Sequence, residues 1–483
     1  MSLVILTPDG VGIRNFVVTF LKRYQGGRVT VMHCLDAPVL ERIVAPLKLD
    51  VEWLPLVVPP ERPVPFTLRH TLSYAHVYWA DTLAMRYNRS RKTGGSWRTR
   101  AANSAARLVG RAASSSEAGV HNLEKLFFYS AKYQPEFEHY CKLFAERRPS
   151  LVLSSSQQSP RVLLPILAAR SLGIPTVAFI GSWDNLTTKG RLAAPFDYFL
   201  VWSENMKREL LQFYPRIAAE RVHVVGTPQF DSYTDPELES TRERFFESLG
   251  ADLSRPLVCF SGGDHTTCPE DQDHLRIVMA AVREGRIRHN PQVVLRPSPV
   301  DPGDRYASVR RDYPELIYMP PAWEHPEPGN WAKCIPMPED GALLANLTRY
   351  ADMNINVAST MTLDFGIRDK PVVNIAFDVK NPPPFGIPLA EMYYPWEHYK
   401  PVVDGHACRV ARSAAELVEQ VNAYLDNPAL DREGRRWLVE YQVGAPIGQS
   451  SQRIAAVLEK LADMPGPVSG LKIASQTRAE ARS

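Results

Sequence analysis

A run of hydroxyl side chains follows an apolar segment in the second half of the chain, in the order Ala358-Ser359-Thr360-Met361-Thr362. The residues before it predict a buried strand, and those after Met361 predict the start of a helix. At a helix start, hydroxyl and free backbone N–H groups face outward beside the positive end of the helix dipole, so a phosphate can bind without a metal ion. An ordinary Ser/Thr helix cap explains the same residues, and the turn alone does not decide between the two.

Two further segments of the same half predict contacts with a phosphate. Gly262-Gly263-Asp264 follows an apolar run, and the glycines would let the backbone approach a ligand closely, although a plain tight turn has the same composition. Arg296 ends a second apolar run, where a doubly wound sheet would present the cation to its ligand crevice. A surface ion pair with Asp301 or Asp304 is the alternative for Arg296.

A polar loop with one indole lies in the first half of the chain. Trp183 is followed directly by Asp184 and Asn185, and Lys189 comes four residues later. A carbohydrate site needs a flat apolar face for stacking and polar groups for the sugar hydroxyls. Trp183, Asn185 and Lys189 are therefore candidate acceptor-binding residues, and a structural loop with Trp183 packed inward is the alternative.

These motifs belong to an alternation of short apolar runs and longer amphipathic segments, which predicts βαβ units and parallel sheets. The pattern restarts after residue 240, so two doubly wound units are expected, joined by a Pro-, Asp- and Ser-rich linker at 226–240. The expected strands are 2–7, 29–33, 151–153, 176–180, 198–202, 222–225, 257–261, 293–295, 353–357 and 372–376. The expected helices are 15–24, 162–172, 271–284, 341–349, 361–368, 414–425 and 450–463.

The segment 351–378, which contains the hydroxyl turn, resembles the nucleotide-sugar site of GT-B glycosyltransferases. Within that superfamily it is similar to bacterial surface-polysaccharide transferases, CDP-glycerol glycerophosphotransferases and 3-deoxy-octulosonic acid transferases. The segment 224–231 resembles the strand and turn that close the first domain of these enzymes. The resemblance is clearest over 175–235 and 255–425 and is weak over 35–150, which leaves the acceptor open.

This resemblance implies roles for particular residues. Ser359, Thr360 and Thr362 would bind the donor phosphates, and Asp364 would orient the turn or a donor hydroxyl. The turn Gly262-Gly263-Asp264 and the cation of Arg296 would also face the donor, and the loop 334–340 would cradle its base through backbone groups.

A transferase that inverts the anomeric centre also needs a general base within reach of the acceptor hydroxyl. Asp9 is the first candidate, because in GT-B folds the turn after the first strand lies at the interdomain cleft, and Gly10 and Gly12 of that turn are candidate acceptor contacts. Asp184 and His265 are the rivals. Asp9 could instead only cap the following helix, and a retaining enzyme would need no such base.

Residues 82–116 contain eight lysines and arginines and no acidic residue. They fit a solvated mobile loop or helical insertion, or a patch that meets anionic lipid or the diphosphate of a lipid-linked acceptor. Nucleic acid is not an expected partner, because the net charge is only +3 and no nucleic-acid motif accompanies the patch.

The cysteine pattern does not indicate a metal centre. The six cysteines form no CxxC pair and no Cys/His cluster with zinc spacing, and no DxD-like set is found, so reduced thiols, no metal and no cofactor are expected. The first residues lack the features of a signal peptide, and no run approaches the roughly 20 apolar residues of a transmembrane helix. A cytoplasmic protein is expected, at the inner face of the membrane if the basic segment binds lipid.

The expected architecture is α/β, with two Rossmann-like domains facing a cleft. Residues 1–235 would bind the acceptor, 240–435 the nucleotide-sugar donor, 436–463 would pack back on the first domain, and 464–483 would form a disordered tail. The expected activity is metal-independent transfer of a sugar from a nucleotide-activated donor to a surface glycan or lipid-linked acceptor. The alternatives are polyol-phosphate transfer from a CDP-glycerol type donor, UDP-sugar epimerisation, and a non-catalytic membrane or assembly partner.

Overall fold

The computed structural model describes residues 1–91, 97–327, 330–331, 333–384, 386–444 and 446–464. The chain forms two compact units. Of the described residues, the first comprises those within Met1–Trp202, Met206–Val225 and Ser451–Met464; the second comprises those within Ser203–Asn205 and Gly226–Ser450. The division after Val225 falls before the expected boundary at 235, and the expected tail at 465–483 lies outside the described residues.

A seven-stranded parallel sheet forms the centre of the first unit, in the order β3-β2-β1-β4-β5-β6-β7. Its strands are β1 (Leu3–Thr7), β2 (Val29–His33), β3 (Glu52–Pro55), β4 (Leu151–Ser154), β5 (Thr176–Phe179), β6 (Tyr198–Val201) and β7 (Val222–Val224). Every residue of β1 and β2 is buried, as in a parallel sheet that helices cover on both faces.

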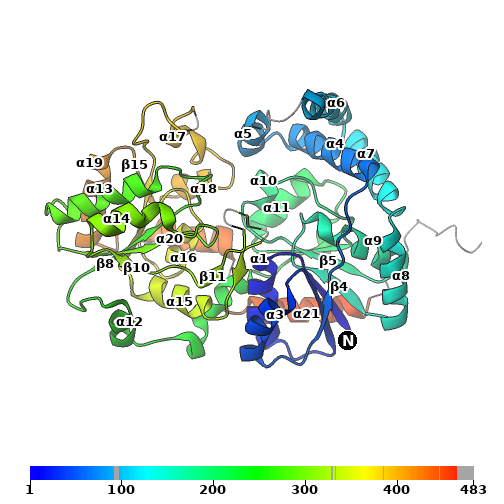
Figure 1. Cartoon of the computed structure of the whole chain (residues 1–483), viewed down its shortest axis with the longest axis horizontal. Helices are drawn as coiled ribbons and strands as arrows, with labels where there is room; N and C mark the ends of the chain where they lie inside the picture. The colour runs from blue at the N-terminus through cyan, green and yellow to red at the C-terminus, as the bar shows by residue number, and fades with distance from the viewer. Residues whose placement is uncertain (92–96, 328–329, 332, 385, 445, 465–483) are drawn as a thin grey trace, which may run out of the picture. The chain divides into compact units, whose positions relative to one another are not determined.

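The helices of the first unit include a group that the sequence left unassigned. They are α1 (Gly10–Gly12), a π-helical stretch (Ile13–Phe20), α2 (Leu21–Arg23), α3 (Ala37–Val44), α4 (Pro63–Ala80), α5 (Leu83–Arg91), α6 (Trp97–Ala113), α7 (Glu117–Ala131), α8 (Pro135–Arg147), α9 (Leu163–Ser171), α10 (Asn185–Thr188), α11 (Glu204–Phe213) and α21 (Ser450–Ala462). Figure 1 shows α4, α5, α6 and α7 grouped together. The basic segment is therefore helical at 83–91 and 97–113, and Lys92 lies outside the described residues.

The second unit is built around a six-stranded parallel sheet in the order β10-β9-β8-β13-β14-β15. Its strands are β8 (Leu257–Ser261), β9 (Gln292–Arg296), β10 (Ile317–Tyr318), β13 (Met353–Asn356), β14 (Val372–Ile375) and β15 (Arg409–Ala411), with a separate antiparallel pair of β11 (Trp323–Glu324) and β12 (Ile335–Pro336). Its helices are α12 (Arg242–Leu249), α13 (Asp271–Arg283), α14 (Ala307–Asp312), α15 (Asp340–Tyr350), α16 (Met361–Ile367), α17 (Leu389–Met392), α18 (Lys400–Asp404), α19 (Ala414–Asp426) and α20 (Arg432–Leu438).

The segment expected as a linker is part of the second unit. It folds into 3-10 helical turns at Pro228–Thr234 and Pro236–Leu238. Phe230 and Tyr233 are each 1% exposed, so the segment contributes to a core and is not a free connection.

The strand order reverses once in each sheet. In the first unit β1 lies between β2 and β4, and in the second β8 lies between β9 and β13. In doubly wound sheets the ligand binds outside the carboxyl ends of the strands at such a reversal. The expected α/β class with two Rossmann-like sheets is confirmed, and among the described residues no helix is both long and apolar enough to cross a membrane.

Candidate functional site

The reversal point of the second sheet brings the two predicted donor segments together. Strands β8 and β13 are direct neighbours, with Phe260 opposite Ile355, so the loops that follow them start side by side. Those loops contain the Gly262–Asp264 turn and the Ser359–Thr360 turn. The residues Asp264, Ser359 and Thr360 are each partly exposed, and His265 is exposed.

The Ser359 turn has an unusual backbone and uses part of its own hydrogen-bonding capacity. Ala358 has φ +40°, a left-handed conformation that is uncommon for a residue other than glycine and is often found at functional sites. The N–H of Ser359 donates to Asn356 Oδ1 at 3.0 Å, and Ser359 Oγ accepts from the N–H of Met361 at 3.3 Å. Helix α16 is only seven residues long, so its dipole alone would stabilise a phosphate only weakly. Ser359 and Thr360 are the partly exposed hydroxyl residues of the turn.

A buried polar network lies beneath this turn, and sequence reasoning missed it. Asn354 Nδ2 donates to Ser261 Oγ at 2.5 Å, and Asn356 Nδ2 donates to Asn354 Oδ1 at 2.6 Å. Thr362 Oγ1 accepts from Asn356 Nδ2 at 3.3 Å and lies 2.9 Å from the Tyr399 hydroxyl. Two asparagines within an apolar strand were the available signal, because buried amides need partners.

The network changes the roles of two residues that were predicted to bind the nucleotide-sugar donor, Thr362 and Asp364. Thr362 is 1% exposed, so its hydroxyl lies under the turn and positions it; in this structure it is not open to a phosphate. Asp364 is 2% exposed and accepts a hydrogen bond of 2.5 Å from the Tyr233 hydroxyl. Asp364 therefore ties α16 to the 228–234 segment and does not face a donor hydroxyl here.

The backbone N–H groups of the Gly262–Gly263 turn form hydrogen bonds within the protein, so they do not have the phosphate-binding role expected from the sequence. The N–H of Gly262 donates to the Arg296 carbonyl at 2.9 Å, and the N–H of Gly263 donates to Asp271 Oδ2 at 2.7 Å. A Cβ at Gly262 would lie 2.3 Å from the Tyr306 hydroxyl oxygen, so close packing of that tyrosine requires the glycine. Neither N–H group is left for a phosphate. Asp264 Oδ1 accepts from the N–H of Thr266 at 2.7 Å and so holds the next turn.

Arg296 makes a buried ion pair and not the surface pair considered from the sequence. Its Nη2 donates to Asp340 Oδ1 at 2.9 Å, with the two residues 4% and 6% exposed. Burial alone would raise the pKa of the Asp340 carboxyl, but Arg296 and hydrogen bonds from Trp323 and Ala322 hold that pKa below its ordinary value. Arg296 Nη1 is buried without a hydrogen-bond partner among the described residues, so one donor of the fixed guanidinium is unused.

In the first unit, Asp9 lies at the reversal point between β1 and β4. Its Oδ1 accepts from the N–H of Gly12 at 2.9 Å, so it caps the helix that begins at Gly10, which is earlier than the expected start at 15. A Cβ at Gly12 would lie 2.1 Å from Ser155 Oγ, so the loop after β4 packs directly against this turn. Burial of the carboxyl group raises the pKa of Asp9, while the Gly12 N–H and the nearby Arg161 partly oppose the shift.

The Trp183 loop has the inward-packed arrangement. Trp183 is 2% exposed, so its ring is covered and cannot stack on a sugar in this structure. Asp184 accepts hydrogen bonds from the hydroxyls of Ser182 at 2.5 Å and Thr188 at 2.9 Å, and it thereby shapes the start of α10. Asn185 is buried and Lys189 is exposed, which leaves Lys189 as the predicted acceptor contact that solvent reaches.

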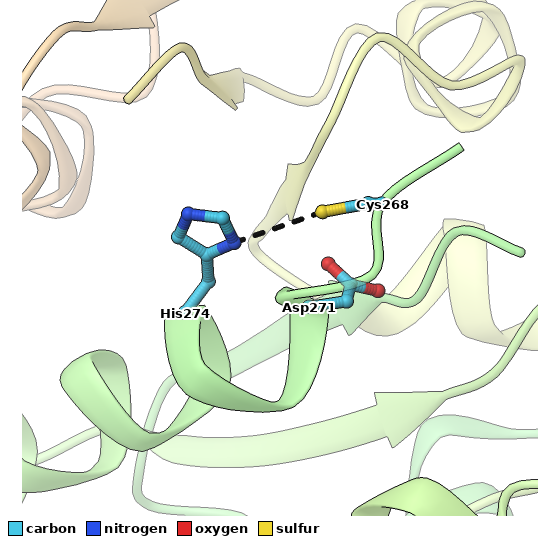
Figure 2. A group of neighbouring side chains, drawn as sticks. All are labelled: Cys268, Asp271 and His274. Carbon is cyan, nitrogen blue, oxygen red and sulfur yellow. Dashed lines mark hydrogen bonds between the residues drawn. The ribbon is translucent and has the colours of Figure 1, made fainter. Parts of the chain in front are cut away.

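The fold also assembles three potential metal ligands that the sequence analysis did not single out. Cys268, Asp271 and His274 are buried, and their donor atoms all lie within 4.8 Å of one another (Figure 2). The spacing Cys-x2-Asp-x2-His was the available signal, and a search restricted to Cys/His pairs misses it because one ligand is a carboxylate.

No known family model and no curated protein matches this chain. Among solved structures it is similar to the UDP-GlcNAc 2-epimerase from Neisseria meningitidis bound to UDP-GlcNAc, with a TM-score of 0.52 and 10% identity over 95% of this chain and 100% of that chain. The UDP-GlcNAc 2-epimerase from Methanocaldococcus jannaschii gives a TM-score of 0.51 and 10% identity over 95% of this chain and 100% of that chain. At such identities the likeness establishes a shared fold, and the chain therefore has the GT-B type of α/β fold that its sequence resembles.

Proposed function

We propose that this protein is a glycosyltransferase that moves a sugar from a nucleotide-activated donor to a surface glycan or a lipid-linked acceptor. The observation that supports it best is that the loops containing Gly262–Asp264 and Ser359–Thr360 start side by side, at the reversal point of the second sheet. Doubly wound sheets bind nucleotides at that position. A protein of the same fold has been solved with UDP-GlcNAc, which supports a nucleotide sugar as the ligand class.

In this proposal the second unit stabilises the leaving phosphate. Ser359 and Thr360 are the partly exposed hydroxyl residues of the turn and would contact this phosphate. The hydrogen bond from the Ser359 N–H to Asn356 fixes the backbone of the turn. Donors held in place before the reaction stabilise developing negative charge without reorganising. Arg296 is 4% exposed and paired with Asp340, so its buried Nη1 would reach this phosphate only after a rearrangement that uncovers it.

In the first unit, Asp9 is the proposed general base for the acceptor hydroxyl. A carboxylate whose pKa is raised by burial accepts a proton more readily than an ordinary aspartate. Its cap hydrogen bond to Gly12 holds the carboxylate in one orientation. The cap and the base are therefore compatible roles for the same side chain.

A thermal-shift screen against UDP-, GDP-, CMP-, CDP- and dTDP-linked compounds tests the donor site. A ligand at 100 times its Kd should add about 2.7 kcal/mol of stability and raise the Tm. We expect a shift with one nucleotide family that Ser359→Ala or Thr360→Ala abolishes. Ser248→Ala is the matched control, because that exposed hydroxyl bonds only within α12. A shift that survives both turn substitutions would remove the donor assignment.

A UDP-sugar epimerase is the second candidate, and the names of the solved proteins that share this fold favour it. An epimerase would convert UDP-GlcNAc without an acceptor, and NMR of that incubation would show the new epimer. A glycosyltransferase would release the nucleotide only when an acceptor is present. Phosphorus retained in the product would instead identify polyol-phosphate transfer from a CDP-glycerol type donor.

A further inference from the structure

Three donor atoms of different kinds converge where the loop after β8 enters α13. Cys268 lies in the loop, Asp271 is the first residue of α13, and His274 lies one turn further along the same helix face. In Figure 2 the Cys268 thiol points at the imidazole, and the Asp271 carboxylate lies beside both. The residues are 2%, 0% and 0% exposed, so water does not solvate the cluster freely.

The imidazole of His274 is oriented with Nδ1 toward Cys268. Its Nε2 lies 2.8 Å from the Phe377 carbonyl oxygen, which can only accept a hydrogen bond, so Nε2 carries the proton. In a neutral ring of this tautomer the lone pair is on Nδ1, and Nδ1 lies 3.7 Å from Cys268 Sγ. A backbone carbonyl that fixes the tautomer through the second ring nitrogen is the usual outer support of a metal-binding histidine.

The Asp271 carboxylate is fixed through one oxygen only. Oδ2 accepts hydrogen bonds from the N–H of Gly263 at 2.7 Å and from the Tyr306 hydroxyl at 2.8 Å. Oδ1 is buried and has no hydrogen-bond partner of ordinary geometry among the described residues. A buried carboxylate oxygen without a partner is costly, and an unseen ion is one explanation for it.

The distance between the sulfur and the nitrogen, together with the charges of the ligands, fits a divalent cation of borderline softness. In tetrahedral zinc coordination, with Zn–S about 2.3 Å and Zn–N about 2.0 Å, sulfur and nitrogen lie about 3.5 Å apart, close to the separation here. A thiolate and a carboxylate would neutralise the two charges of the ion. Arg305 lies beside the cluster: its Nε is 2.7 Å from Asp301 Oδ2, and its Nη2 is 3.5 Å from Asp271 Oδ2, the carboxylate oxygen that the protein already holds.

We propose that Cys268, Asp271 and His274 bind one Zn²⁺, which joins the loop after β8 to α13. The sulfur, nitrogen and oxygen donor set suits zinc better than magnesium or calcium, which prefer oxygen ligands alone. Because Asp271 also holds the N–H of Gly263, the ion would stiffen the same turn that faces the proposed donor.

The alternative role for Cys268 beside His274 is that of a nucleophilic cysteine, and the surroundings of the thiol disfavour this role. Cys268 is 2% exposed, so a substrate does not reach its sulfur from solvent, whereas reactive cysteines lie in partly exposed sites. A bound Zn²⁺ would hold the deprotonated thiolate.

The test is metal analysis of the untagged full-length chain, purified without chelator. We expect about one zinc per chain by elemental mass spectrometry, and after cobalt exchange an intense thiolate-to-cobalt band in the near ultraviolet. Cys268→Ser and His274→Gln should each weaken zinc binding by more than the roughly 10–100-fold that follows loss of an outer-shell partner. Cys334→Ser is the control, because Cys334 is equally buried in the same unit and belongs to no such ligand group among the described residues.

Circular dichroism and gel filtration show whether each variant folds. If Cys268→Ser does not fold, the cobalt band of the unsubstituted chain and its loss in His274→Gln decide the question. A folded chain that binds neither zinc nor cobalt overturns the proposal, as does a cobalt band that Cys334→Ser removes and Cys268→Ser leaves unchanged. None of these readouts depends on catalytic activity, so failure of the transferase proposal leaves the test intact.

Discussion

At the scale of single residues, Asp9 carries the sharpest prediction. Asparagine caps a helix as well as aspartate does, so Asp9→Asn keeps the fold but removes the proton acceptor. We expect kcat/KM to fall about 10²–10⁴-fold, the usual contribution of a general base. Asp50→Asn, an exposed aspartate in the same unit, should leave kcat/KM unchanged. Full activity of Asp9→Asn would assign Asp9 the cap role alone.

The pH dependence follows from the raised pKa of Asp9. The base works only when ionised, so the acidic limb of kcat/KM should lie above the ordinary aspartate pKa of 3.8. Because the folded-state pKa is higher than the unfolded one, the stabilising contribution of Asp9 is present at low pH and is lost as pH rises through the folded pKa. Asp9→Asn should remove both the limb and this loss of stability. A limb that is unmoved in that variant would belong to another group.

Arg296 shows why a loss of activity does not by itself identify a ligand contact. Arg296→Met would leave Asp340 buried and unpaired, which should cost about 3–5 kcal/mol in the free energy of unfolding. Arg276→Met is the control, because its pair with Asp312 is well exposed and should contribute less than about 1 kcal/mol. Urea unfolding of both variants measures the difference, and equal costs would mean that burial of the Arg296 pair is unimportant.

At the scale of elements, β13 and α16 act as one support for the hydroxyl turn. The chain of amides and hydroxyls from Asn354 through Asn356 to Thr362 links the end of β8 to the start of α16. A buried network with its partners in place fixes one arrangement, because breaking any link leaves an unsatisfied polar group. The strained Ala358 is therefore held by its surroundings, and the turn does not depend on helix propensity.

Helix α6 combines exposed apolar and basic residues. Leu108 and Val109 are 74% and 53% exposed, and Arg100 and Arg111 on the same helix are also exposed. An apolar contact beside cations complements an anionic lipid surface, where each basic residue contributes about 1 kcal/mol.

We therefore expect the protein to bind vesicles rich in phosphatidylglycerol and to release them at high salt. In a flotation assay, Leu108→Ser with Val109→Ser should reduce binding severalfold, while Leu253→Ser, an exposed leucine of the second unit, should not. Equal binding to neutral vesicles, or none to either kind, would remove the membrane role of this helix.

At the scale of the whole molecule, each unit has its own parallel sheet and its own core. A ligand stabilises the unit whose residues it contacts, so a nucleotide sugar should slow amide hydrogen exchange mainly within 226–450. The peptides covering β8, β13 and the turns after them should show the largest protection. Protection confined to the first unit would place the donor there and overturn the assignment of the two units.

The sequence by itself determined the fold class and most of the central strands. β2 and β8 lie at the expected residues, and β1, β5, β13 and β14 differ by about one residue at an end. Strands buried on both faces are rich in apolar residues, and that pattern marks them in the sequence. The edge strands β3, β10 and β15 were not predicted. They are two to four residues long and mostly only partly buried, so they lack that pattern; β7, a three-residue edge strand, was predicted within 222–225.

Only the tertiary structure decided the partners of the candidate residues. Arg296 meets Asp340 across 44 positions, and Cys268 meets His274 only because the loop turns directly into α13. Gly263 gives its N–H to Asp271, and Trp183 turns inward, although composition suited both to a ligand. Local patterns specify strands and caps because those depend on near neighbours. The chemistry of a polar side chain depends on which distant groups the sheet order brings to it, and that is settled only when the chain packs.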